Sequence, residues 1–165
     1  MIRPLAGNDL VERSAALAEQ WHEGQEHFFG GDGSYFNVHL APVAEIVGRL
    51  GYGALYIAGA YLHDIREDTA VTDELLLEAG IPSEVVHAVD LMTKRKGQSR
   101  DQYLGGILTS RIAIVDKFAD SSFNYAWTLL NSPEVNSQKF IERSLGYAYN
   151  ISILRPRLPD LDNVA

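Results

Sequence analysis

Five ionisable residues occur within six positions of this chain, directly after a long uncharged stretch. Ala54–Leu62 has no charged side chain, and the segment that follows reads His63-Asp64-Ile65-Arg66-Glu67-Asp68-Thr69. Burying such groups is costly unless they are paired or bind a metal. On a helix, His63 and Glu67 would be i,i+4 neighbours, as would the two aspartates. Because imidazole and carboxylate groups are ligands of divalent transition metals, the segment predicts either a metal site or a solvated helix end near a capping threonine.

A metal site needs ligands from other parts of the chain, and two regions offer them. His39 has apolar neighbours on either side, so it is either a ligand or a satisfied core histidine. Lys117, Asp120 and Asn124 fall at i, i+3 and i+7 along a later helical pattern. They form one polar stripe, which either enters a site or faces solvent.

The elements that must position these residues are helical almost throughout, because apolar residues recur at three- and four-residue spacing. Ala54–Leu62 is apolar on every side, which predicts a central buried helix, with a strand as the competing interpretation. Thr72, Ser83 and Asn37 are predicted N-caps. The other predicted helices are 11–22, 37–50, 73–79, 84–92, a long pattern marked by Leu108, Ile112, Val115, Ala119, Ala126 and Leu130, and 134–154.

Composition limits the class of protein and of partner. The 165 residues, 46% of them hydrophobic and 22% charged, are typical of one globular domain. The absence of cysteine excludes disulfides and thiolate ligands. A net charge of −8 disfavours nucleic acid and anionic membranes as partners, although a small phosphorylated substrate needs only a local basic pocket. No secretory signal or membrane span is recognisable, so we expect a cytoplasmic protein whose oligomeric state is left open.

In their order along the chain, His39, then His63-Asp64, then Asp120 give an H…HD…D pattern. With this pattern the sequence resembles the HD superfamily of metal-dependent phosphohydrolases. Four segments extend the resemblance to the hydrolase domain of the RelA/SpoT alarmone enzymes and to the stand-alone small alarmone hydrolases, including the metazoan SpoT homologue. They are Trp21-His22-Glu23-Gly24-Gln25, Tyr35-Phe36-Asn37-Val38-His39, His63-Asp64-Ile65-Arg66-Glu67-Asp68-Thr69 and Lys117-Phe118-Ala119-Asp120-Ser121-Ser122-Phe123-Asn124.

The resemblance, which covers about residues 15 to 150, implies an all-α fold. We expect a single compact HD-domain bundle of about six to eight helices over residues 1–154, with an irregular tail at 155–165. It also implies one divalent metal, commonly Mn²⁺, held by His39, His63, Asp64 and Asp120. Asp116, one turn before Asp120, is a rival for the last position, and the register of the family motif favours Asp120.

The same resemblance implies roles for residues around the metal. Glu67 and Asp68 would activate or orient the attacking water, the alternative being a pairing with Arg66 or another nearby basic residue. Asn124, Arg143 and Tyr147 match residues that line the nucleotide pocket of the family. Lys117, one turn from Asp120 on the same face, is expected to neutralise substrate phosphate. The chain departs from the family at Glu26-His27, where a basic residue usually follows the Gly-Gln pair and contacts the guanine nucleotide. His27 is the nearest substitute there. Leu40 also stands where the family has a proline after the metal-binding histidine.

We therefore expect a hydrolase of the stringent response that removes the 3′-pyrophosphate of (p)ppGpp. The alternatives are an HD phosphohydrolase acting on another nucleotide, and a metal-dependent nucleotide-binding module without turnover. Because the hydrolase pattern reaches almost to the end of the sequence, we expect a dedicated degrader without a synthetase domain.

Overall fold

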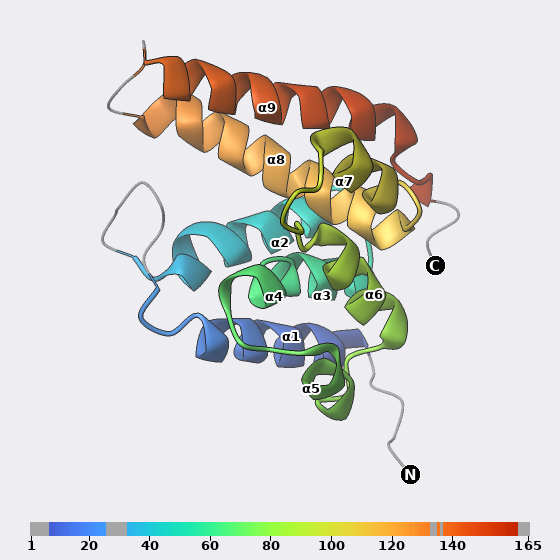
Figure 1. Cartoon of the computed structure of the whole chain (residues 1–165). Helices are drawn as coiled ribbons and strands as arrows, with labels where there is room; N and C mark the ends of the chain where they lie inside the picture. The colour runs from blue at the N-terminus through green and yellow to red at the C-terminus, as the bar shows by residue number, and fades with distance from the viewer. Residues whose placement is uncertain (1–6, 26–32, 133–134, 136, 162–165) are drawn as a thin grey trace.

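Helical periodicity along the sequence is matched by the computed structural model, in which every regular element of the described residues is helical (Figure 1). The structure describes residues 7–25, 33–132, 135 and 137–161. The prediction of an all-α fold is confirmed. In chain order the elements are α1 (Gly7–Trp21), the π-helical turn η1 (Phe36–Leu40), α2 (Ala41–Arg49), α3 (Ala54–Leu62), α4 (Ile65–Asp68), α5 (Asp73–Glu78), α6 (Ser83–Met92), α7 (Arg100–Ile107), α8 (Arg111–Asn131), α9 (Gln138–Leu154) and the 3₁₀ turn η2 (Arg155–Arg157).

The apolar helix α3 is the centre of the bundle, as predicted. It packs against α1, α2, α6 and α8, and α9 forms an outer layer on α8 (Figure 1). Small residues on α3 let α8 approach closely: a Cβ added at Gly59 would overlap Asp116 Oδ2 and lie 2.9 Å from Ile112 Cγ2. This contact holds the C-terminal end of α3 beside the middle of α8. The charged segment that begins at His63 follows directly after this end of α3.

Three predictions about helix boundaries are wrong and one is confirmed. Thr72 caps α5 by accepting a hydrogen bond from the Leu75 N–H, as predicted. Asn37 is not an N-cap: it lies inside η1, and its N–H donates to Ser34 Oγ at 3.3 Å. Ser83 is not a cap either, because α6 already includes it. The long pattern is broken at residues 108–110, where Ser110 caps α8 and separates it from α7.

Burial along the outer helices also differs from the predicted pattern. Leu130 is 82% exposed and Ala126 is exposed, because no element among the described residues covers that side of the last turns of α8. On α1 the apolar spacing predicts a buried face marked by Val11, Ala15, Ala18 and His22. Ala18 and His22 are buried as predicted, whereas Leu10 and Ser14 are buried in place of Val11 and Ala15. Within the described ranges, no helix is both long and apolar enough to cross a membrane.

Candidate functional site

Within the charged segment, His63 and Asp64 form a turn after α3, and Arg66, Glu67 and Asp68 lie on the short helix α4. His63 ends α3, and Asp64, with φ −101° and ψ −3°, precedes α4. The predicted pairing of His63 and Glu67 along one helix is not seen, because His63 lies in the turn before α4. Asp64 and Asp68 do lie one helical turn apart, since the Asp68 N–H donates to the Asp64 carbonyl at 3.0 Å. The His63 Nδ1–H donates to the Ala60 carbonyl at 2.7 Å, which leaves Nε2 facing the interior of the site.

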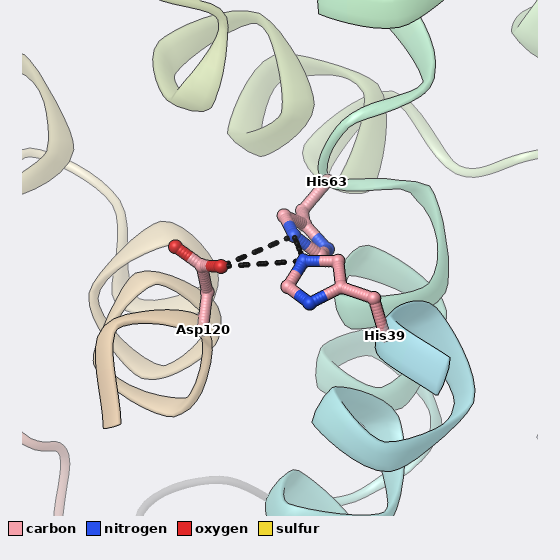
Figure 2. A group of neighbouring side chains, drawn as sticks. All are labelled: His39, His63 and Asp120. Atoms are coloured by element: carbon pink, nitrogen blue, oxygen red, sulfur yellow. Dashed lines mark hydrogen bonds and ion pairs between the residues drawn. The ribbon is translucent and has the colours of Figure 1, made fainter. Parts of the chain in front are cut away.

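Side chains from three elements converge at this turn. Figure 2 shows His39 from η1, His63 from the end of α3 and Asp120 from α8 pointing toward one another. The two Nε2 atoms are 3.2 Å apart, and Asp120 Oδ1 lies 3.4 Å from that of His39 and 3.5 Å from that of His63. Asp64 Oδ2 completes the cluster at 3.3 Å from His39 Nε2 and 3.0 Å from His63 Nε2.

This donor set fits a divalent metal ion. Metal–ligand bonds of about 2.0–2.2 Å place neighbouring ligand atoms roughly 3.0–3.5 Å apart, the range seen in the cluster. Both imidazoles and Asp120 are buried, and a metal ion or a shared proton would satisfy the Nε2 atoms that face Asp120 Oδ1. The same electrostatic environment shifts the pKa values of these groups. Burial opposes the charged form of His63 and would raise the pKa of Asp120. The carboxylates nevertheless hold the pKa of His63 well above its usual value, and Lys117 and the imidazoles hold that of Asp120 well below.

Asp116, the rival candidate, lies outside this cluster. It is fully buried one turn earlier on α8, and neither carboxyl oxygen has a hydrogen-bond partner among the described residues. Burial raises its pKa well above the usual value, and the nearby His63 only partly opposes this. In this geometry Asp120 contributes an oxygen to the group and Asp116 does not.

A cavity of about 380 Å³ opens above the cluster. Every described residue predicted for the site lines it, except His63, which lies buried beneath. His27 falls outside the described residues. The lining is Tyr35, His39, Asp64, Glu67, Asp68, Lys117, Asp120, Asn124, Arg143 and Tyr147.

The two carboxylates proposed for water activation stand at the mouth of this cavity. Glu67 Oε2 accepts a hydrogen bond from the Lys94 N–H at 3.3 Å, and Asp68 Oδ2 accepts one from Gln25 Nε2 at 2.8 Å. Partial burial raises the pKa of Glu67 despite the opposing bond from Lys94. The alternative ion pair with Arg66 is not seen, since Arg66 Nη1 lies 2.7 Å from Asp73 Oδ1 and 2.6 Å from Asp90 Oδ1.

Two residues predicted to contact substrate are already bonded to Asp120. Lys117 Nζ lies 2.7 Å from Asp120 Oδ2, and Asn124 Nδ2 donates to Oδ1 at 2.5 Å. They orient this carboxylate and neutralise it, while still bordering the cavity. Arg143 and Tyr147 line the cavity from α9, and burial raises the pKa of the Tyr147 hydroxyl.

Tyr35 is the site residue to which the sequence pattern gave no role. Its hydroxyl donates to Asp64 Oδ2 at 2.6 Å, and it lines the cavity. The available signal was its position four residues before His39, within one of the segments that carry the family resemblance.

Comparisons with known proteins agree with this geometry. No protein-family model matches the chain. The GTP pyrophosphokinase of Myxococcus xanthus is 36% identical over 86 residues, which are 52% of this chain and 11% of that protein. The guanosine-3′,5′-bis(diphosphate) 3′-pyrophosphohydrolase of Haemophilus influenzae is 33% identical over 88 residues, 52% of this chain and 13% of that protein. The chain thus matches only a small part of these long relatives.

A solved structure extends the similarity to nearly the whole chain. It is that of a metazoan ortholog of SpoT that hydrolyzes ppGpp and plays a role in starvation responses. It superposes with a TM-score of 0.73 over 98% of this chain and 93% of that chain, at 20% sequence identity, which shows a shared fold. The resemblance to RelA/SpoT-type (p)ppGpp hydrolase domains is therefore confirmed, by local sequence similarity and by the fold of the described residues.

Proposed function

We propose that this protein is a metal-dependent phosphohydrolase that removes the 3′-pyrophosphate of (p)ppGpp. The observation that carries the proposal is the convergence of His39, His63, Asp64 and Asp120 at the floor of a cavity whose mouth holds Glu67 and Asp68. Sequence similarity to a guanosine-3′,5′-bis(diphosphate) 3′-pyrophosphohydrolase supports the choice of substrate.

In this proposal those four residues hold one divalent ion, Mn²⁺ in our assignment. Such an ion lowers the pKa of a water molecule and polarises a phosphoryl oxygen. The protein supplies a buried and rigid set of ligands, since His63 is fixed by Ala60 and Asp120 by Lys117 and Asn124. Partners of this kind around metal ligands typically set their orientation.

Glu67 is the proposed general base. Its raised pKa brings the carboxylate closer to the pH at which a proton is both accepted and released efficiently. Glu67 takes a proton from the attacking water as the water oxygen bonds to phosphorus. The bond from phosphorus to the 3′-oxygen breaks, and this oxygen takes up a proton to become the 3′-hydroxyl. The products from ppGpp are GDP and pyrophosphate. Asp68, held by Gln25, orients the water.

The charge of the cavity makes substrate binding depend on the metal. Four carboxylates line it, against the two cationic side chains Lys117 and Arg143, and Lys117 is already paired with Asp120. A polyanionic nucleotide would be repelled by this lining. We therefore propose that the divalent ion binds before the nucleotide, and that Arg143 and Tyr147 then contact the substrate.

Incubation of the purified protein with ppGpp and Mn²⁺, followed by anion-exchange separation of nucleotides and a pyrophosphate assay, tests the proposal. We expect equal amounts of GDP and pyrophosphate. Intact ppGpp beside turnover of a nucleoside mono- or triphosphate would transfer the activity to another nucleotide. Metal-dependent binding of nucleotides with no turnover of any would indicate a binding module.

A further inference from the structure

The hydroxyl of Tyr35 is bonded to the oxygen atom that joins Asp64 to the metal cluster. Its O–H donates to Asp64 Oδ2 at 2.6 Å. That same oxygen lies 3.0 Å from His63 Nε2 and 3.3 Å from His39 Nε2. Tyr35 therefore acts on the ligand atom of Asp64 itself, and not on its outer oxygen.

Asp64 needs such a partner more than the other three members of the cluster do. It sits in the turn between α3 and α4, its side chain makes no helix-capping hydrogen bond, and it is 20% exposed. The last torsion of an aspartate side chain is broad, so a partly exposed carboxylate without a second partner can rotate. Asp120, by contrast, is 4% exposed and bonded through both oxygens.

Tyr35 is itself held in place from two sides. Its ring stacks on His22, with ring centroids 5.3 Å apart, and lies against His39 at 5.0 Å. His22 is buried at the end of α1, and its Nδ1 lies 2.8 Å from the Ala18 carbonyl oxygen. The backbone N–H of Tyr35 donates to the Gln25 carbonyl at 3.0 Å. These contacts fix the orientation of the Tyr35 ring and so keep its hydroxyl within hydrogen-bond distance of Asp64.

We propose that Tyr35 is a positioning residue of the metal centre: it fixes Asp64 Oδ2 toward the two imidazoles and so raises metal affinity without being a ligand. The inference rests on the proposed metal site. Removing a hydrogen-bond partner of a metal ligand typically weakens metal binding about 10- to 100-fold. The stacking of His22 on Tyr35 gives this buried histidine a role, which is to hold the Tyr35 ring.

Tyr35→Phe tests this inference, with Tyr52→Phe as the matched control. Tyr52 also donates one hydroxyl hydrogen bond to a protein oxygen, the Pro159 carbonyl at 2.9 Å, but it does not line the cavity. Calorimetric titration of the metal-free proteins with Mn²⁺, without nucleotide, gives the dissociation constants. We expect binding about 10- to 100-fold weaker in Tyr35→Phe and unchanged in Tyr52→Phe. The visible absorption of bound Co²⁺ should shift only in Tyr35→Phe, because the donor strength of Asp64 changes.

The outcomes separate this inference from the proposed function. Unchanged Mn²⁺ affinity and an unchanged Co²⁺ spectrum in Tyr35→Phe would overturn the role of Tyr35 and leave the metal site intact. A wild-type protein that binds neither ion would overturn the metal site, and this inference with it. If Tyr35→Phe is partly unfolded without metal, the Mn²⁺ concentration that restores its circular dichroism reports the same affinity. A midpoint no higher than that of Leu76→Ala, a variant destabilised in the core of α5 away from the cavity, would count against the proposal.

Discussion

Asp116 is a fully buried carboxyl group on α8, and its replacement by asparagine should make the protein more stable. The side chain is fully buried, and neither oxygen has a hydrogen-bond partner among the described residues. Burial raises its pKa well above the usual value, and His63 opposes this only in part. Asparagine has the same shape and no titrating proton, so Asp116→Asn removes the cost of this titration while keeping the packing.

The sign of the effect follows from proton linkage. A carboxyl group whose pKa is higher in the folded state takes up a proton on folding. Its contribution to stability is therefore greatest below the unfolded pKa of about 3.9 and declines as pH rises toward the folded pKa. Within that window the decline is about 1.4 kcal/mol per pH unit. The free energy of unfolding of Asp116→Asn should exceed that of the wild type at neutral pH, by an amount that shrinks on acidification.

Urea unfolding of the metal-free proteins between about pH 5 and about pH 7 measures this difference. Asp160→Asn, at an exposed position near the end of the described chain, is the control for replacing an aspartate by asparagine outside the core. A difference that stays constant with pH, or an Asp116→Asn protein less stable than the wild type at neutral pH, would refute the reasoning. Loss of Mn²⁺ binding in Asp116→Asn would instead restore Asp116 as the metal ligand in place of Asp120.

Three further predictions concern the site and its support. Glu67→Gln should lower kcat by about 10²- to 10⁴-fold and leave the Mn²⁺ affinity unchanged. Glu84→Gln, at an exposed position on α6, is the control and should change neither quantity. Full activity of Glu67→Gln in the nucleotide assay would exclude the general-base role. A chelator should lower the Tm and abolish hydrolysis, and Mn²⁺ should restore both, because the clustered acceptors lose their cation; a Tm indifferent to chelator and Mn²⁺ would contradict the site. Gly59→Ala should lower the free energy of unfolding by about 1–3 kcal/mol, because the added Cβ would overlap Asp116 Oδ2. The loss should be smaller in an Asp116→Ala background. Equal losses in the two backgrounds, measured by urea unfolding, would disprove the contact.

The fold was predictable wherever local pattern and packing agree. The apolar run of Ala54–Leu62 predicted a central helix, and α3 has those bounds and is largely buried among its neighbours. The boundary between α7 and α8 was not predicted, because Leu108 and Ile112 keep helical spacing across it. Only the hydrogen bond from the Ala113 N–H to Ser110 Oγ, at 3.3 Å, shows where the second helix starts. A residue such as Ser110 can either cap a new helix or continue the previous one, and tertiary packing decides which of the two forms.

The site was predictable in its residues and not in its geometry. Spacing placed His39, the His63-Asp64 pair and Asp120 on separate elements, and the family resemblance joined them. Nothing in the spacing showed that the chain turns between His63 and Ile65, or that Tyr35 reaches Asp64. Both depend on how η1 and the end of α1 pack around the turn, which is a long-range property of the fold.

The choice between Asp116 and Asp120 illustrates this dependence on packing. The two lie one turn apart on α8 and present the same chemistry, so periodicity cannot separate them. On α3, Gly59 and His63 are also one turn apart, a rise of about 6 Å. Because Gly59 lets α8 come close enough for Asp116 to pack directly on α3, the next turn of each helix brings Asp120 Oδ1 to 3.5 Å from His63 Nε2. The close approach at Gly59 therefore sets the spacing of the metal centre, and Gly59→Ala should weaken Mn²⁺ binding as well as stability, which the same calorimetric titration would measure.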